Sequence, residues 1–437
     1  MRAWRIRPAK ALQGRWTPSG DKSITHRAII LGALAEGTTE IDHFLESDDC
    51  LRTLRIAQAL GVQAEPIDMH RWRITGLGKR EPNEPSDVLD AGNSGTTTRL
   101  MAGVLASYPL FSVLTGDESL RRRPMRRIVE PLRQMGAQID GRQEATRLPL
   151  AIRGTQLRAL HYLTPVASAQ VKSCILLAGL RASGVTEVTE PQLSRDHTER
   201  MLRAFGVELE EQFGTQGSHR VRLRGGQTLT ACKLRVPGDF SSCAFMLAGA
   251  LLLPGSDLVI EGVGVNPTRT GMIQALAQGG AHLEWEQVDE QGGEPMASLR
   301  VRAQPLKAMQ IAGELIPSLV DEVPILAVMA TQAHGTTEIR DAHELRVKES
   351  DRLATITEEL RKMGAQIECL PDGLRIHGPT PLYGAPVQSH GDHRIAMALA
   401  IAGLVAQSGE TLVQDVDCVA TSFPDFEAVL HQLVEWR

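Results

Sequence analysis

Positively charged side chains recur at the start of segments that the sequence predicts to be helices. Six polar loops each precede an apolar, mostly Ala-rich segment: SGDKSITHR (19–27), GNSGTTTR (92–99), ASAQVKS (167–173), PGDFSS (237–242), SLVDEVP (318–324) and SHGDHR (389–394). A helix N-terminus has free N–H groups and a partial positive charge, so it attracts anions. The cations beside these termini are Lys22, Arg27, Arg99, Lys172 and Arg394. Helix capping explains the Ser, Thr and Asp but not the cations, so the pattern predicts an anionic ligand.

Two further segments concentrate charge. RRRPMRR (121–127) has five arginines in seven residues, which fits a solvated face and only weakly a nucleic-acid patch. In LRVKESDR (345–352), a helix would put Lys348 and Arg352 on one face with Glu349 beside them. Alone, such a segment is usually a surface ion-pair ladder. Together with the loop cations, it indicates a cleft for more than one phosphate or carboxylate.

The elements that position these loops repeat six times along the chain. Each apolar segment ends at a turn and is followed by a β-branched strand, and the turns lie at Gly37, Tyr108, Gly184, Gly255, Gly335 and Gly409. Several repeats add a second helix that ends in a Gly-centred turn, at 132–139, 202–209 and 360–367. The first helix of each repeat is apolar on nearly every side, which predicts burial. Chance similarity of Ala-rich helices is the alternative; a propeller is disfavoured because its blades contain only strands. We expect an α/β fold with three repeats in each of two domains.

Composition limits the classes of function. The chain has 437 residues with a net charge of −5, 42% hydrophobic and 23% charged, which fits a globular protein and excludes nucleic-acid binding through overall charge. The longest apolar run, 395–406, is shorter than the ~20 residues that span a bilayer. The six cysteines form no CxxC pair and no zinc-site spacing. We therefore expect a soluble cytoplasmic protein without a metal.

Seven motifs in order, between residues 20 and 394, resemble the EPSP synthase family of enolpyruvyl transferases. They are GDKSITHR, GNSGTTTR, the RRRP stretch, SAQVKS, DEVP, RVKESDR and GDHR. The resemblance implies a two-domain, inside-out α/β barrel-like fold, with six strand–helix repeats and buried parallel helices whose N-termini face an interdomain cleft. Pro18 and Pro237 precede comparable Gly-Asp turns, where we place the two chain crossings. The expected domains are 21–240, and 1–20 plus 241–437.

The resemblance also implies an activity. The family transfers the enolpyruvyl group of phosphoenolpyruvate (PEP) to the 5-hydroxyl of shikimate 3-phosphate and releases phosphate, in the shikimate pathway to chorismate and the aromatic amino acids. It uses no organic cofactor and no metal, and glyphosate competes with PEP in it. We accordingly expect two small-molecule substrates, a monomer, and neither nucleic acid nor membrane as a partner.

Carried over position by position, the family motifs imply the site residues. For shikimate 3-phosphate they are Lys22, Ser23, Arg27, Ser168, Ala169 through its backbone, Gln170, Ser194, Asp321 and Lys348. For PEP they are Lys22, Asn93, Gly95, Arg123, Gln170, Arg352 and Arg394. Arginine forks suit the carboxylates and phosphates of both substrates. Asp321 fits the base for the 5-hydroxyl proton, and Glu349, with Lys22 as the alternative, fits the acid and later base at the PEP methylene.

Some positions differ from those of many family members. His197 replaces a Tyr near the shikimate carboxylate, Glu344 replaces an Asn, Leu100 replaces a Pro, and no Lys precedes Phe423. These differences concern the subtype and not the reaction. Two alternatives are the enolpyruvyl transferase acting on UDP-N-acetylglucosamine and a non-catalytic anion-binding repeat scaffold. The absence of Cys from 107–130 argues against the first, and the acid and base candidates argue against the second.

Overall fold

The chain forms two compact units, each with its own hydrophobic core. The computed structural model describes residues 2–214 and 217–437, apart from the side chains of Gln287 and Gln291. Unit 1 comprises Met1–Ser19, Gly238–Asp289 and Pro295–Arg437. Unit 2 comprises Gly20–Pro237 together with the short segment Glu290–Glu294, which the sequence did not predict to group there. Of the two large buried apolar clusters, one lies in unit 1 and the other in unit 2.

Unit 2 contains three repeats of strand, buried helix, strand, second helix and hairpin. The first has β14 (Lys233–Arg235), α1 (Lys22–Leu34), β3 (Thr38–Asp42), α2 (Asp48–Ala59), β4 (Gln63–Asp68) and β5 (Arg71–Thr75). The second has β6 (Leu89–Asp90), α3 (Gly95–Ala106), β7 (Phe111–Thr115), α4 (Glu118–Arg122), α5 (Arg126–Met135), β8 (Gln138–Gly141), α6 (Arg142–Ala145) and β9 (Leu150–Arg153). The third has β10 (His161–Leu163), α7 (Ala169–Gly179), β11 (Val185–Glu190), α8 (His197–Ala204), β12 (Leu209–Phe213) and β13 (His219–Arg224).

Unit 1 has three similar repeats, the third of which lacks the hairpin. Its first repeat has β2 (Ala9–Trp16), α9 (Phe240–Leu252), β15 (Asp257–Gly264), α10 (Gly271–Gln278), β16 (Glu284–Gln291) and β17 (Glu294–Arg302), with β24 (Val434–Trp436) on the sheet edge. The second has β18 (Gln310–Ile311), α11 (Ile316–Leu319), α12 (Val323–Gln332), β19 (Gly335–Ile339), α13 (Arg352–Lys362), β20 (Gln366–Leu370) and β21 (Gly373–Gly378). The third has β22 (Pro386–Gln388), α14 (His393–Val405), β23 (Thr411–Gln414), α15 (Phe426–Leu433) and β1 (Ala3–Ile6).

Six small mixed sheets result, and all six share one pairing rule. The strand after each buried helix pairs in parallel with one neighbouring strand, as β7 does with β6 and β19 with β18. It pairs antiparallel with the strand on its other side, as β7 does with β9 and β19 with β21. The same arrangement holds around β3, β11, β15 and β23. The mixed α/β fold expected from the sequence is confirmed.

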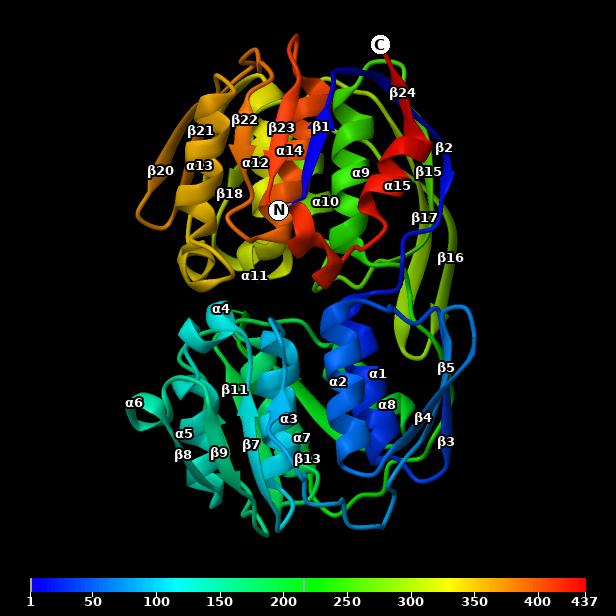
Figure 1. Cartoon of the computed structure of the whole chain (residues 1–437), viewed down its shortest axis with the longest axis vertical. Helices are drawn as coiled ribbons and strands as arrows, with labels where there is room; N and C mark the ends of the chain where they lie inside the picture. The colour runs from blue at the N-terminus through cyan, green and yellow to red at the C-terminus, as the bar shows by residue number, and fades with distance from the viewer. Residues whose placement is uncertain (1, 215–216) are drawn as a thin grey trace. The chain divides into compact units, whose positions relative to one another are not determined.

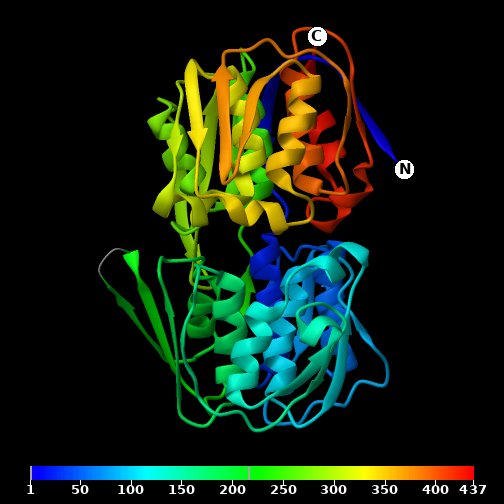
Figure 2. The same ribbon diagram turned by 90° about the vertical axis from the view of Figure 1, so that its left-hand side faces the viewer.

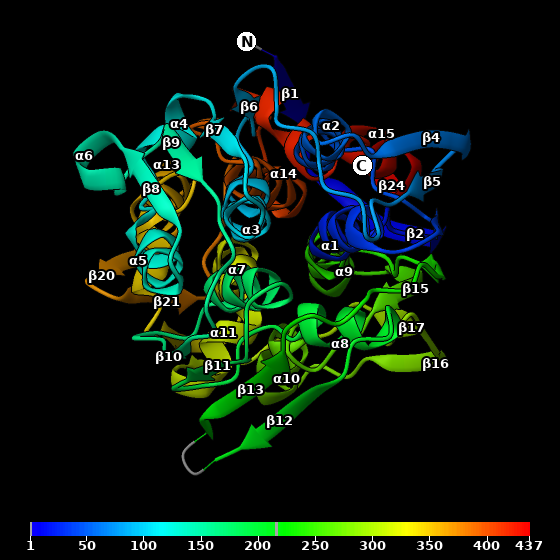
Figure 3. The ribbon, with the colours of Figure 1, turned by 90° about the horizontal axis from the view of Figure 1, so that it is seen from below.

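The apolar helices lie inside their units. A helix that is apolar on every side is stabilised when all of its surface is removed from water. In α9 every residue from Phe240 to Leu251 is buried. In unit 1, α9, α12 and α14 contact one another and stand side by side in Figure 1. In unit 2, Figure 3 shows the sheets around α1, α3 and α7, and Figure 2 shows the strands β19 and β21 along the outside of unit 1. A Cβ on Gly103 would lie 2.3 Å from the Cys174 carbonyl oxygen, so glycine there permits close contact of α3 with α7.

Lys348 and Arg352 do not share one face of a helix, as a helix over 345–352 would have placed them: a 3-10 helix spans His343–Val347, and α13 begins only at Arg352. The Asp351 side chain accepts the Ala354 N–H at 3.1 Å and so starts a new helix at this point. Lys348 therefore pairs with Glu344 at 3.3 Å, while Arg352 is buried elsewhere.

Candidate active site

Lys22 and Arg27 lie on the first two turns of α1. The Asp21 side chain caps this helix by accepting the Ile24 N–H at 2.9 Å. The Lys22 ammonium lies 3.1 Å from Asp49 Oδ2, and the Lys22 side chain remains 17% exposed, so a ligand can reach it. The predicted residue Ser23 follows Lys22, and its carbonyl accepts a hydrogen bond from Arg27 at 2.9 Å.

The Arg27 guanidinium joins three helices of unit 2. It donates to Thr198 Oγ1 at 2.7 Å and to Ser173 Oγ at 2.9 Å, in addition to the Ser23 carbonyl. Burial lowers the pKa of Arg27 to about 10, although Glu199 and Asp21 oppose this. Arg195 acts in the same direction as burial, so a second cation lies near Arg27. The motif comparison did not select Arg195.

Four of the residues predicted to bind PEP lie around the start of α3. Arg123 donates to Asn93 Oδ1 at 2.6 Å and to the Asn93 carbonyl at 3.2 Å, which fixes the loop before the helix. Gly95 is the first residue of α3. Gln170 is held from both ends, because its Oε1 accepts from Arg99 at 2.7 Å and its Nε2 donates to Thr96 at 3.1 Å.

Ser168 and Ser194 lie on separate loops of the third repeat and meet at one buried carboxylate. The Ser168 N–H donates to Glu190 Oε1 at 3.0 Å, and the Ser194 hydroxyl lies 2.7 Å and 2.9 Å from the two Glu190 oxygens. Ser168 precedes α7, whose first residue is the predicted Ala169, and its side chain makes no capping hydrogen bond.

Lys172 corrects an expectation from the sequence. It was expected as an accessible cation beside a helix N-terminus, but its side chain is 0% exposed. Its ammonium lies 2.8 Å from Glu190 Oε2 and 2.7 Å from Glu199 Oε1. Burial lowers the pKa of Lys172, but Glu199 and Glu190 outweigh it and raise the pKa above its usual value. Lys172 is therefore a buried structural cation that a ligand does not reach.

In unit 1, Arg352 gathers three carboxylates. Its guanidinium donates to Asp392 Oδ2 at 2.7 Å, to Asp321 Oδ1 at 3.1 Å and to Glu349 Oε2 at 2.6 Å. Burial lowers the pKa of Arg352, but Asp392, Glu349 and Asp321 outweigh it and raise the pKa. The side chains of Asp321 and Glu349 are 13% and 17% exposed, so both carboxylates reach the surface of this buried group.

Arg394 adds a second cation to the same group. Its Nε lies 3.8 Å from Asp321 Oδ1, and its Nη1 lies 3.9 Å from Glu322 Oε1. Asp392 caps α14 by accepting the Arg394 N–H at 2.9 Å, so one carboxylate positions both arginines. Lys348 lies apart from these contacts, with Glu344.

Sequence reasoning missed the buried partners of the predicted residues. Asp49, Glu190 and Asp392 each hold a residue expected to touch a substrate. Asp392 stood inside the GDHR motif and could have been chosen because a buried arginine needs a carboxylate. The sequence gives no comparable signal for Glu190, which looks like an ordinary residue at a strand end.

The positions that differ from many family members lie in defined surroundings. The His197 Nδ1 is 2.7 Å from Glu294 Oε1, and both side chains are buried. Leu100 is fully buried in α3. The Phe423 ring stacks on Trp16, with 5.8 Å between the centroids.

Two clusters among the described residues have the composition of a metal site. They are Glu199, Glu211 and His219, and Glu358, Glu359 and His390. Lys172 pairs with Glu199 and Arg203 with Glu211, while Lys362 pairs with Glu358 and Glu359. Because each carboxylate already has a basic partner, these clusters fit ion-pair networks better than cation sites.

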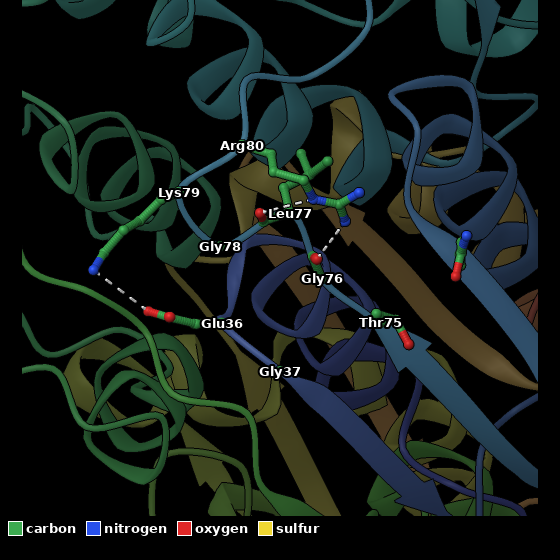
Figure 4. Close-up of a pocket in the computed structure, with 9 residues that line it drawn as sticks. Glu36, Gly37, Thr75, Gly76, Leu77, Gly78, Lys79 and Arg80 are labelled. Carbon is green, nitrogen blue, oxygen red and sulfur yellow. Dashed lines mark hydrogen bonds and ion pairs between the residues drawn. The ribbon is translucent and has the colours of Figure 1, made fainter.

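A pocket of about 540 Å³ lies in the first repeat of unit 2, between the Glu36–Gly37 turn and residues 75–80 (Figure 4). Lys79 pairs with Glu36 at 3.9 Å, and Arg80 donates to the carbonyls of Leu77 and Gly76. Its lining includes none of the residues predicted to bind a substrate.

The two groups of polar residues combine anion-binding cations with carboxylates able to move protons. Among the described residues, no helix is long and apolar enough to cross a membrane. The whole chain superposes on the enolpyruvyl transferase NikO from Streptomyces tendae, with a TM-score of 0.78, 18% identity, and coverage of 99% of this chain and 97% of that one. The fold is thus that of the enolpyruvyl transferases.

Closer relatives identify the family. The sequence model of the family EPSP synthase (3-phosphoshikimate 1-carboxyvinyltransferase) matches residues 6–430. The enzyme of that name from Gloeobacter violaceus is 56% identical, covering 97% of both chains, and that from Desulforamulus reducens is 51% identical, covering 98% of this chain and 99% of the relative. The structure of EPSP synthase from Acinetobacter baumannii matches with a TM-score of 0.87 at 42% identity. The match covers 100% of this chain and 99% of that one.

The chain belongs to the EPSP synthase family. It is a 3-phosphoshikimate 1-carboxyvinyltransferase, an enzyme of the shikimate pathway. The alternatives that the sequence left open, the UDP-N-acetylglucosamine enzyme and the non-catalytic scaffold, are thereby set aside.

Proposed function

We propose that the predicted residues bind shikimate 3-phosphate and PEP and carry the transfer of the enolpyruvyl group to the 5-hydroxyl. The observation that carries this proposal is the arrangement around Arg352, where one buried cation fixes two partly exposed carboxylates, Asp321 and Glu349. The reaction needs one group that accepts the hydroxyl proton and one that delivers a proton to the methylene of PEP.

Asp321 accepts the proton of the 5-hydroxyl. Its carboxylate is oriented by Arg352 and lies near the Arg394 guanidinium, so it is held in one place while remaining partly exposed. Lys348, which lies with Glu344 in the same unit, binds the hydroxyls of the shikimate ring.

Glu349 protonates the methylene carbon of PEP, which makes the adjacent carbon cationic and open to attack by the 5-hydroxyl. After attack, a base removes a proton from the same carbon as phosphate leaves, and Glu349 again fits this role. Lys22 is the alternative donor, because its ammonium is partly exposed and is paired with Asp49.

The anionic groups of the substrates bind to the remaining predicted residues. Arg123, Arg352, Arg394 and Lys22 bind PEP, with Asn93, Gly95 and Gln170 shaping its place. Ser168, Ala169, Ser194, Ser23 and Arg27 bind shikimate 3-phosphate. The N-terminus of α7 supports the phosphate position, because its first N–H groups and the Ser168 hydroxyl make no capping hydrogen bond with each other.

Turnover with each acceptor tests the proposal. The chain should release phosphate from PEP in the presence of shikimate 3-phosphate and should not do so with UDP-N-acetylglucosamine. Turnover that survives replacement of both Asp321 and Glu349 by amides would contradict the assignment of acid and base.

The same family membership supports three further parts of the proposal. The six repeats form the two-domain, inside-out barrel-like architecture of the family, with domains near 21–240 and 1–20 plus 241–437. The active form is a monomer. The enzyme acts in the cytoplasm, a reducing compartment that suits its six free cysteines.

A further inference from the structure

The third repeat of unit 2 contains a buried ionic network that the reaction itself does not use. Glu190 at the end of β11 and Lys172 on α7 both have fully buried side chains, and their charged groups lie 2.8 Å apart. Lys172 also lies 2.7 Å from Glu199 on α8, which is buried as well. Ions are costly to bury, so a network of this kind needs a structural reason.

Glu190 accepts hydrogen bonds from several donors, and His219 Nδ1 lies 3.9 Å from its Oε2. Its Oε1 accepts the Ser168 N–H at 3.0 Å, and its Oε2 accepts the Ser194 N–H at 3.4 Å and the Lys172 ammonium at 2.8 Å. The Ser194 hydroxyl lies within 2.9 Å of both oxygens. One carboxylate therefore ties the loop before α7 to the loop after β11 and sets the spacing between the two serines.

We propose that Glu190 and Lys172 are positioning residues for the phosphate group of shikimate 3-phosphate. Glu190 holds Ser168 and Ser194 at the spacing that the phosphate requires, and Lys172 supplies the charge that allows a carboxylate to be buried beside an anion site. This inference rests on the proposed role of the two serines in phosphate binding.

The backbone N–H and the ammonium on either side of Glu190 make Glu190→Gln a sharp test. Whichever way the new amide is turned, its NH2 group faces a donor, either the Ser168 N–H or the Lys172 ammonium. The substitution keeps the shape of the side chain, and Lys172 keeps Glu199 as its counter-ion, so we expect the variant to fold. Lys172→Met leaves two buried carboxylates without their cation and should lower the melting temperature. The double variant Glu190→Gln, Lys172→Met should recover part of that lost stability.

Glu359 provides a matched control in unit 1. Its fully buried carboxylate accepts the Gln388 N–H at 2.9 Å and contacts Lys362 and His390, each at 2.8 Å. Glu359→Gln therefore perturbs a similar network, but one away from the two serines.

The experiment measures dissociation constants for shikimate 3-phosphate and for shikimate by calorimetry, because their ratio isolates the contribution of the phosphate. Hydrogen bonds to charged groups are strong enough that Glu190→Gln should weaken shikimate 3-phosphate by about tenfold or more. Shikimate binding should change less than about twofold, and Glu359→Gln should leave the ratio unchanged. A loss of affinity in Glu190→Gln that is confined to shikimate 3-phosphate supports the proposal.

Two results would overturn this inference alone, and a third would also overturn the proposed phosphate site. If Ser194→Ala and Ser168→Gly weaken shikimate 3-phosphate but Glu190→Gln does not, the network does not position the serines. If Glu190→Gln weakens both ligands equally and lowers the melting temperature as Glu359→Gln does, its role is only structural. If the serine variants bind shikimate 3-phosphate normally, the proposed phosphate site is wrong and this inference fails with it.

Discussion

Replacing Asp321 by Asn removes the proposed base while preserving its surroundings. Arg352 contacts Asp321 at 3.1 Å but also donates to Asp392 and Glu349, so it remains anchored after the substitution. The amide oxygen of Asn can still accept the Arg352 hydrogen bond. The change therefore removes a proton acceptor without leaving a buried arginine unpaired.

These contacts set the expected size of the effect. Loss of a general base costs about 10²–10⁴-fold in kcat, which corresponds to roughly 3–5 kcal/mol in the activation free energy. Substrate binding loses only the extra strength of a charged over a neutral acceptor, about 1 kcal/mol. The dissociation constant of shikimate 3-phosphate should therefore change by less than about tenfold.

Phosphate release from PEP under saturating substrates measures kcat, and calorimetry measures the dissociation constant separately. Asp372→Asn is the control, because Asp372 pairs with Arg340 at 3.1 Å in the same unit and lies outside the proposed site. A kcat within tenfold of the parent enzyme, or a loss of affinity larger than the loss of kcat, would refute the role of Asp321 as the base.

Three other substitutions give independent tests. A Cβ on Gly95 would lie 2.6 Å from Arg99 Nη1, the end of a flexible side chain that can move, so the Gly95→Ala variant should fold. In inhibition titrations, this variant should raise the inhibition constant of glyphosate more than it raises the Michaelis constant for PEP. Burial lowers the pKa of His219, but Glu190 and Glu211 outweigh burial and raise the pKa above its usual value. The protonated His219 therefore stabilises the fold fully below the unfolded pKa of about 6.5, and this stabilisation is lost as the pH rises through the higher folded pKa. In urea denaturation, the advantage of the parent enzyme over His219→Gln should accordingly shrink as the pH rises above the unfolded pKa of about 6.5. Asp392→Asn leaves Arg352 without its fully buried carboxylate partner and should lower the free energy of unfolding of unit 1 by about 3 kcal/mol in the same assay; an unchanged midpoint would contradict this.

Much of the fold could be predicted because each repeat carries strong local signals. The all-apolar segments became buried helices, and the β-branched segments after them became strands, as in α14 and β23. The short strands that complete the sheets, such as β6 with two residues, carry too little pattern to be seen. The grouping of 290–294 with unit 2 depends on tertiary contacts such as that between His197 and Glu294, which no local pattern encodes.

From the sequence, the candidate site could be proposed only where a residue type had no local structural explanation. Loop cations such as Lys22 and Arg394 stood out because capping does not require them. The same argument failed for Lys172, because a cation beside a helix N-terminus can turn inward to buried carboxylates that come from distant strands and helices. It also did not identify Arg352 as the centre of a carboxylate group, because Asp321 and Asp392 come from segments distant in the sequence.

The insertion of unit 2 between β2 and α9 has a consequence for synthesis on the ribosome. Strand β2 ends at Trp16, but its parallel partner β15 begins at Asp257, and β1 must wait for β23 at Thr411–Gln414. At about 5–20 residues per second, β2 emerges roughly 10–50 s before its partner. Unit 2 meanwhile closes on itself, because β14 at 233–235 completes the sheet of β3 and the Asp21 N–H bonds the Pro237 carbonyl at 2.8 Å. A nascent chain released near residue 237 should therefore carry unit 2 folded except for its segment 290–294, preceded by two unpaired strands, a state exposed to aggregation and to chaperones.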